Sequence, residues 1–303
     1  MIDFSGYIDK VTYYARILGK ETNCTVGNVE GLSYKLYRSV EQVRGIVVAY
    51  HGGGVNSQAG YGIFAQKLCM MAPLAVCLVD IRGHGQSDGA RGTVDSPERI
   101  WSDVDIMLQE MKRLFPLARL YLFGHSSGAG MLLNYFTRHC PQHKVDGLFM
   151  LACELGPFAN FKRLHDGSPP FAEINQWPFI INALSRGLFC GQTLAVKLHF
   201  SEEVLASMNG FVERYSVNMA NALTPRYPDK QLAVLPLPAH FLIAEKDELF
   251  SPTEMEEFAT RYGSPSLKVS VLPECSHLDC VFAVAPYLYK NLTQDWSNLR
   301  ETE

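Results

Sequence analysis

The stretch Leu120-Tyr-Leu-Phe-Gly-His-Ser-Ser-Gly-Ala-Gly130 decides the fold of this chain. Its first residues form an apolar run of strand length, and an amphipathic segment of helix length follows at Gly128–His139. Between the two lies Gly124-x-Ser126-x-Gly128, the spacing of a sharp turn from a strand into a helix. Because glycine has no Cβ, the two glycines allow this turn. The pattern predicts a nucleophile elbow that raises Ser126 above the edge of a sheet.

Apolar runs of strand length alternate with amphipathic segments on both sides of this elbow. We expect strands at 33–39, 45–51, 75–80, 119–124, 145–152, 239–246 and 268–273. We expect helices at 61–71, 97–115, 128–139, 252–262 and 278–292. Strands that are apolar throughout are typical of a parallel sheet with helices on both faces. The prediction is an α/β fold with a doubly wound, mostly parallel sheet of about eight strands.

One connection is too long for this alternation of strands and helices. About 85 residues separate the strand that ends near Ala152 from the strand that begins near Ala239, several times what a crossover helix needs. We therefore predict a core formed by 1–154 and 236–303, which includes an extra N-terminal helix at 1–20. We expect 155–235 to form a helical cap after strand six: a lid over a substrate pocket or, alternatively, a subdomain on the sheet edge.

A serine nucleophile needs a base, and the base needs an acid that orients it. Asp247 and His277 each follow a predicted strand, as Ser126 does, so all three can meet at the carboxyl edge of the sheet. Their order along the chain, serine then aspartate then histidine, is that of a known hydrolase arrangement. We predict Ser126, Asp247 and His277 as catalytic residues. Glu248 and Glu154 are alternative acids.

Acyl transfer also needs donors for a tetrahedral oxyanion. The peptide N–H of Ser127, at the start of the elbow helix, is one candidate. The second should come from the loop His51-Gly-Gly-Gly54, where we favour Gly53 and place Gly54 next. A glycine-rich loop can instead hold a phosphate, but no Lys-Ser or Lys-Thr pair follows it here.

The elbow glycines also have the Gly-x-x-x-Gly-x-Gly spacing typical of short-chain dehydrogenases, which bind a dinucleotide. That class carries the motif at the start of its fold and uses a Tyr-x-x-x-Lys pair for proton transfer. The motif lies at residue 124 in this chain, and none of its 14 tyrosines has a lysine four positions later. The hypothesis of a short-chain dehydrogenase is therefore disfavoured.

Composition excludes further classes. The 303 residues include 27 basic and 31 acidic side chains. The sequence contains no basic stripe that could neutralise the phosphates of a nucleic acid. Apolar runs fall short of the roughly 20 residues that span a bilayer, and charges interrupt the first 20 residues. We expect no integral membrane association, no export signal and a cytoplasmic location. The eight cysteines contain no Cys-x-x-Cys pair, which favours reduced thiols over disulfides or a metal site.

With these residues in place, the sequence resembles the α/β-hydrolase superfamily, and within it the monoglyceride lipase and lysophospholipase-like branch. The resemblance rests on HGGG at 51–54, VDIRGHGQSDGARG at 79–92, GHSSG at 124–128, LIAEKDELF at 242–250 and the CSH that ends at His277. In the second of these motifs, we interpret Arg82 and His84 as structural residues.

The residues and the resemblance together imply a serine hydrolase that cleaves a carboxylic ester through an acyl-enzyme, without a cofactor. The expected substrate is a small-molecule or lipid-like acyl ester: an acyl glycerol, a lysophospholipid or a small ester. Thioesters, lactones, amides and acyl transfer to another alcohol are alternatives for the same site. A non-catalytic binding protein of the same fold is a further alternative, and a homo-oligomer is left open.

Overall fold

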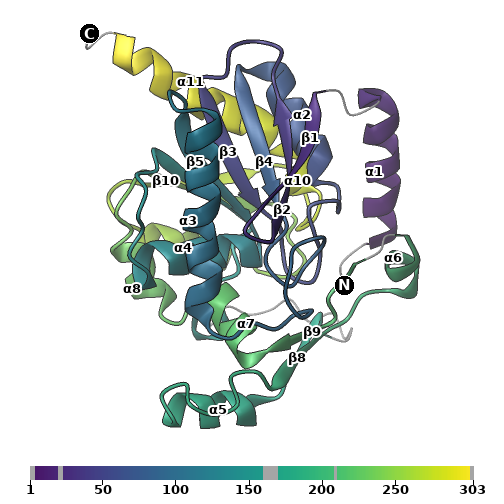
Figure 1. Ribbon diagram of the computed structural model, residues 1–303, viewed down its shortest axis with the longest axis vertical. Helices are drawn as coiled ribbons and strands as arrows, with labels where there is room; N and C mark the ends of the chain where they lie inside the picture. Colours follow the sequence, from purple (N-terminus) through teal and green to yellow (C-terminus); the bar gives the residue numbers. More distant parts are fainter. Residues whose placement is uncertain (1–3, 20–22, 160–169, 208–209, 301–303) are drawn as a thin grey trace.

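A computed structural model describes residues 4–19, 23–159, 170–207 and 210–300 of the chain (Figure 1). The strands are β1 (Cys24–Val29), β2 (Leu32–Arg38), β3 (Gly45–Tyr50), β4 (Leu74–Val79), β5 (Arg119–His125), β6 (Gly147–Leu151), β7 (Ala172–Ile174), β8 (Leu194–Leu198), β9 (Arg214–Ser216), β10 (Ala239–Ala244) and β11 (Leu267–Leu272). The helices are α1 (Phe4–Leu18), α2 (Tyr61–Met71), α3 (Pro97–Leu114), α4 (Ser127–Arg138), the 3-10 turn Pro157–Ala159, α5 (Gln176–Leu184), α6 (Glu202–Ser207), α7 (Val217–Leu223), α8 (Pro228–Ala233), α9 (Pro252–Tyr262), α10 (Cys280–Ala283) and α11 (Ala285–Arg300).

Eight of the strands form one sheet in the order β1-β2-β4-β3-β5-β6-β10-β11. The pairs from β4 through β11 are parallel, whereas β2 runs antiparallel to both β1 and β4. This confirms the predicted mostly parallel α/β sheet. The prediction missed β1, which forms a hairpin with β2 through Glu30 and Gly31, both at positive φ. A two-residue turn of this kind matches the twist of a hairpin.

Helices cover both faces of the sheet, as the apolar strands require (Figure 1). Successive side chains of a strand point to opposite faces. In β3, Ile46 and Val48 pack in the layer that includes α3 and α4, whereas Val47 and Ala49 pack in the layer that includes α2 and α11. All four side chains are at most 2% exposed, so the strand before the HGGG loop is fixed from both sides.

The connection between β6 and β10 carries an inserted segment. We expected this segment to be helical, but only part of it is. It contains a second sheet, antiparallel and ordered β7-β8-β9, beside short helices. Two of these strands have only three residues each, too short for an alternating pattern to be recognised. In Figure 1, β8, β9 and α5 lie at the bottom of the molecule, below the main sheet.

The two ends of the chain differ slightly from expectation. The predicted N-terminal helix is α1, which packs on the core through Tyr7, Ile63 of α2 and Phe282 of α10. The predicted last helix is divided at Val284 into α10 and α11. Within the described residues, no helix is both long enough and apolar enough to cross a membrane.

Candidate active site

Ser126 lies at the turn from β5 into α4, in a backbone conformation that costs free energy. Its φ of 53° and ψ of −120° lie outside the regions that L residues normally adopt. A Cβ on Gly124 would lie 2.5 Å from the amide nitrogen of Ala129, and one on Gly128 would lie 2.5 Å from the carbonyl oxygen of His51. Both contacts are with backbone that cannot give way. The elbow geometry therefore depends on glycine at these two positions.

His277 and Asp247 complete a line of side chains that starts at Ser126. His277 Nε2 lies 3.0 Å from the Ser126 hydroxyl oxygen, and His277 Nδ1 lies 2.8 Å from an Asp247 carboxylate oxygen. The second Asp247 oxygen accepts hydrogen bonds from the peptide N–H groups of Leu249 and Phe250 at 2.8 and 3.0 Å. Since the carboxylate is fixed by three donors, the imidazole is held with Nε2 directed at the serine.

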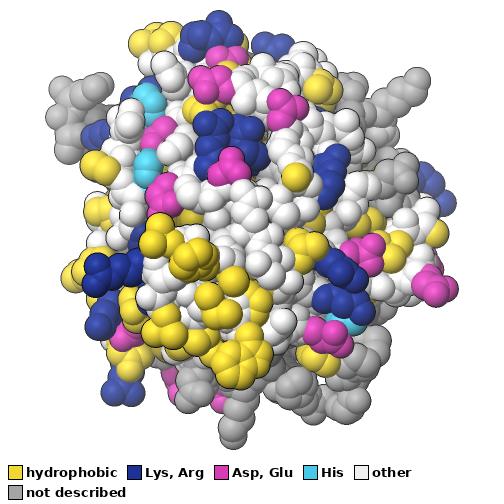
Figure 2. Space-filling model, turned by 60° about the horizontal axis from the view of Figure 1, so that its bottom comes forward, with side chains coloured by type: hydrophobic (Ala, Val, Ile, Leu, Met, Phe, Trp, Pro, Cys, Tyr) yellow, Lys and Arg dark blue, Asp and Glu magenta, His cyan; other side chains and the backbone are white. Residues whose placement is uncertain are grey.

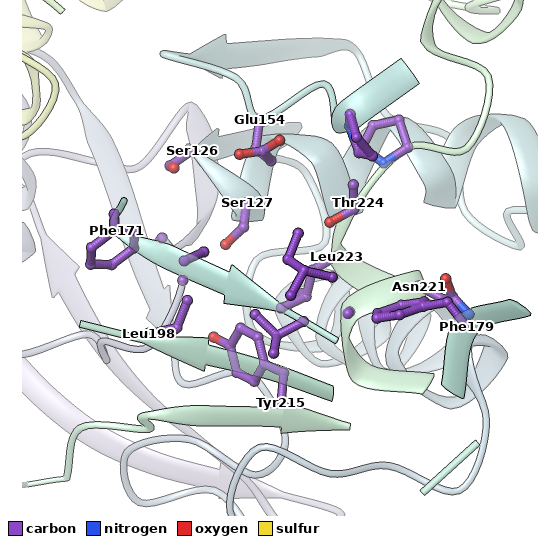
Figure 3. A pocket seen from close by; sticks show the side chains of 18 of the residues that line it. Ser126, Ser127, Glu154, Phe171, Phe179, Leu198, Tyr215, Asn221, Leu223 and Thr224 are labelled. Atoms are coloured by element: carbon purple, nitrogen blue, oxygen red, sulfur yellow. The ribbon is translucent and has the colours of Figure 1, made fainter. Parts of the chain in front are cut away.

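The two glutamates considered as alternative acids lie elsewhere. The Glu248 carboxylate accepts a hydrogen bond from the peptide N–H of His277 at 2.9 Å, so it holds the loop rather than the ring. The Glu154 carboxylate accepts the peptide N–H of Gly156 and lies on the pocket wall near Ser127 (Figure 3). Asp247 is the carboxylate in hydrogen-bond contact with the imidazole.

Burial and charge shift the pKa values of His277 and Asp247 in opposite directions. Burial by itself would lower the pKa of His277, but the Asp247 charge and hydrogen bond outweigh it and raise the pKa above its usual value. Burial would raise the pKa of Asp247, and the His277 charge together with the hydrogen bonds it accepts lowers it instead. Asp247 is therefore the group that stays ionised when His277 takes up a proton.

The HGGG loop lies beside the elbow. A Cβ on Gly52 would lie 3.4 Å from the Cβ of Ser126, and a Cβ on Gly53 would lie 3.2 Å from the Ser127 hydroxyl oxygen. The Gly52 N–H donates to the Tyr61 hydroxyl at 2.8 Å, and the Gly54 N–H donates to the Tyr215 hydroxyl. Gly53 is thus the glycine of this loop whose amide is not bound by a tyrosine. The amide of Ser127 begins α4 beside it.

Two residues near His277 were not identified as site candidates from the sequence. Tyr61 and His125 form a 2.7 Å hydrogen bond, and the other ring nitrogen of His125 donates to the carbonyl oxygen of His277 at 2.9 Å. Burial, together with the charge of His277, lowers the pKa of His125 to about 3 and keeps it neutral. His125 occupies the variable position of Gly-x-Ser, and that spacing says nothing about what its side chain contacts.

The region around Arg82 is structural, in keeping with the interpretation of its motif. Its guanidinium forms two hydrogen bonds, of 2.7 and 2.9 Å, with the carboxylate of Asp103 on α3. This bidentate pair ties the loop after β4 to the helix that follows it.

A cavity of about 1230 Å³ opens over Ser126 (Figure 3). Besides core residues, the inserted segment lines it with apolar side chains such as Phe171, Phe179, Leu198 and Leu223. Typical ligand pockets measure about 300–1,000 Å³, so this one accommodates a large ligand. The insert therefore supplies much of the wall that faces the reacting serine.

Part of the chain is similar to known protein sequences. Residues 41–179 match the family model described as Serine aminopeptidase, S33. A protein phosphatase methylesterase 1 of Candida albicans is 27% identical over 135 residues, which are 44% of this chain and 36% of that protein. The match thus spans about a third of that relative's length.

Solved structures resemble most of the chain. A soluble variant of monoglyceride lipase from Saccharomyces cerevisiae superposes with a TM-score of 0.65 at 14% identity, over 91% of this chain and 95% of that one. Est1E from Butyrivibrio proteoclasticus gives 0.59 at 12% identity, over 91% of this chain and all of the other (100%). The carboxylesterase CesB from Bacillus subtilis gives 0.53 at 12% identity, over 95% and 96% of the two chains. At these identities the likeness concerns the fold.

The sheet order, the strand-to-helix elbow and the superposed structures define the fold of the chain. The chain has the fold of the α/β hydrolases, as its motifs predicted, and residues 41–179 match one family model.

Proposed function

We propose that this chain hydrolyses lipid-like carboxylic esters by acyl transfer to Ser126. The observation that carries the proposal is the continuous contact from Ser126 through His277 to Asp247, with distances of 3.0 and 2.8 Å, at the base of a large cavity. A serine hydroxyl becomes an effective nucleophile when such a base and orienting acid are hydrogen-bonded to it.

The proposed reaction has two halves. His277 Nε2 takes the Ser126 proton as the serine oxygen bonds to the ester carbonyl, and the Gly53 and Ser127 amides hold the oxyanion. His277 then gives its proton to the leaving alcohol, which departs and leaves an acyl-enzyme. A water molecule, deprotonated by the same histidine, attacks this ester, and the acid leaves as Ser126 regains its proton. Asp247 stays ionised throughout.

The lining of the cavity supports an acyl ester with a long apolar chain. Ile174, Ile180 and Leu188 line the cavity and are also exposed at the surface, so part of its outer wall is apolar. On the face in Figure 2, hydrophobic side chains gather on the inserted segment, where Trp177, Leu184 and Phe189 are also exposed. Burying a methylene against such a wall contributes about 0.8 kcal/mol, so a longer chain gains affinity.

Two measurements test this function. A fluorophosphonate probe should label the wild-type protein and leave Ser126→Ala unlabelled, because the phosphorus bonds to the activated serine oxygen. Among p-nitrophenyl esters, kcat/KM should rise from acetate to chains of eight carbons or more. A folded wild type that the probe does not label overturns the enzyme assignment. Labelling combined with a preference for acetate or butyrate overturns the lipid-like substrate and leaves a small-ester hydrolase.

A further inference from the structure

The inserted segment holds the oxyanion loop at Gly54. Tyr215 of β9 accepts a hydrogen bond from the Gly54 N–H, and the peptide N–H of Val212 donates to the Gly54 carbonyl oxygen at 2.8 Å. Gly54 has a φ of 74°, and a Cβ there would lie 2.8 Å from the carbonyl oxygen of Val212. Both polar groups of Gly54 are therefore bound by a segment that lies more than 150 residues further along the chain.

His84 fixes the direction of the Tyr215 hydroxyl. One ring nitrogen of His84 lies 3.2 Å from the carbonyl oxygen of Arg82, which requires that this nitrogen carry the proton. Burial lowers the pKa of His84 to about 3, so its other nitrogen is an acceptor, and the Tyr215 hydroxyl donates to it at 2.8 Å. Tyr215, which is 5% exposed, thus uses its proton on His84 and its oxygen on Gly54.

Two flanking bonds determine how Gly53 is oriented. Because a peptide unit is planar, the 2.8 Å contact between His51 Nδ1 and the Gly52 carbonyl oxygen also sets the direction of the Gly53 N–H. The next peptide unit, between Gly53 and Gly54, is held by Tyr215 through the Gly54 N–H. Glycines rotate with little steric resistance, so without this bond the second unit is free to turn.

The same part of the insert is also attached to the core at a second point. The peptide N–H of Ser216 donates to the carbonyl oxygen of Gly92 at 3.0 Å, and a Cβ on Gly92 would lie 2.0 Å from the carbonyl oxygen of Arg214. Residues 212–216 therefore cannot move away from the core without breaking contacts to both the 79–92 motif and the HGGG loop.

We infer that Tyr215 is a positioning residue for the oxyanion hole, and that residues 212–216 of the insert are a fixed part of the catalytic apparatus rather than part of a moving lid. This inference rests on the proposed function and deepens it. Any opening of the pocket then occurs in other parts of the insert. The pair of contacts from Tyr215 to Gly54 and His84 couples the cap to transition-state stabilisation.

Tyr215→Phe tests this inference, since it removes the hydroxyl and keeps the ring. A 1 Å displacement of a catalytic group can cost about 100-fold, and loss of one oxyanion donor about 100- to 1,000-fold. We expect kcat for a p-nitrophenyl ester to fall by about 10- to 100-fold with KM nearly unchanged, because the loss falls on the transition state. The inhibition constant of an alkyl trifluoromethyl ketone, whose adduct carries the oxyanion, should weaken by the same factor.

Tyr50→Phe is the matched control. Tyr50 is also a buried tyrosine, on β3 just before the HGGG loop, and its hydroxyl has no hydrogen-bond partner among the described residues. The Tyr50→Phe variant should retain the wild-type kcat and inhibitor affinity. His84 provides a second pair of variants. His84→Gln can place an acceptor near the position of Nε2 and should retain activity, whereas His84→Ala should lose activity in the same way as Tyr215→Phe.

The outcomes separate this inference from the proposed function. If wild-type protein hydrolyses the ester and Tyr215→Phe matches Tyr50→Phe in kcat and in inhibitor affinity, the positioning role is wrong and the proposed function stands. If kcat falls without a matching loss of trifluoromethyl ketone affinity, the positioning role is likewise wrong. If the wild type neither hydrolyses esters nor reacts with a fluorophosphonate, the proposed function itself fails.

Discussion

At the residue scale, the ionisation of His277 controls the proposed reaction. The ring is 2% exposed, and the neighbouring Asp247 charge keeps its pKa above the ordinary histidine value of 6.5 in spite of burial. The imidazole must be neutral to accept the Ser126 proton, and protonation therefore removes the active form as the pH falls. The neutral histidines His84 and His125 do not titrate in this range, because burial has lowered the pKa of each to about 3.

The pH profile follows from this difference. We expect kcat/KM of the wild type to decline on the acid side with a midpoint above pH 6.5, the ordinary value for histidine, and tenfold per pH unit below it. Asp247→Asn removes the charge that raises the pKa, so its midpoint should move to lower pH while its plateau falls by about 10⁴-fold. Initial rates from pH 5 to 9 check both. A wild-type midpoint below 6.5, or an unshifted midpoint in the variant, would contradict the assignment.

At the scale of the element, the elbow depends on the close approach of α4 to the loop after β3. Gly128 lies where a Cβ would meet the His51 carbonyl at 2.5 Å and the Tyr50 carbonyl oxygen at 2.7 Å. The strand cannot easily move aside, since β3 lies between β4 and β5 in the sheet. A side chain at position 128 would therefore press on the start of the HGGG loop.

Gly128→Ala should therefore destabilise the protein by about 3 kcal/mol, because a methyl group would overlap backbone atoms. Gly147→Ala is the comparison: its nearest atom, on the Tyr121 ring, lies 3.3 Å away and belongs to a side chain. Gly147→Ala should cost less than about 1 kcal/mol, as expected for a contact that a side chain can relieve. Urea unfolding of the two variants measures the difference. Equal stabilities would show that the approach of α4 is looser than described.

At the scale of the whole molecule, α1 is an addition that joins the core at the side of α2 and α10 (Figure 1). The Tyr7 ring stacks on Phe282 at 5.0 Å, and its hydroxyl donates to the carbonyl oxygen of Ala59 at 2.7 Å. Ala59 belongs to the segment between the HGGG loop and α2. Phe4, from the same helix, lines the cavity and contacts Phe171 of the insert. The N-terminal helix therefore touches both the core and the insert.

Tyr7→Ala should lower the free energy of unfolding by about 3 kcal/mol, since it removes a buried ring and a buried hydrogen bond. Tyr13→Ala, on the same helix, replaces a side chain that is 52% exposed and should change stability by at most about 0.5 kcal/mol. Denaturant titration of both variants measures the two changes in the free energy of unfolding. If the two cost the same, α1 does not contribute through this cluster.

Local patterns in the sequence determined the class of the fold and the candidate residues. Apolar runs predicted seven of the eight strands in the main sheet, and the positions of Ser126, Asp247 and His277 after such runs placed them on one edge. This was possible because strand burial and glycine turns are local properties, expressed in a few consecutive residues. The catalytic roles of these residues stay predictions for the experiments above.

Only the tertiary structure decided which distant side chains support that edge. The contacts of Tyr215 with Gly54 and His84 join three segments of the chain, and the short strands of the insert depend on pairing with one another. Tyr61 and His125 meet across 64 positions for the same reason. No periodicity in the sequence encodes such contacts, because each depends on where independently packed elements come to lie.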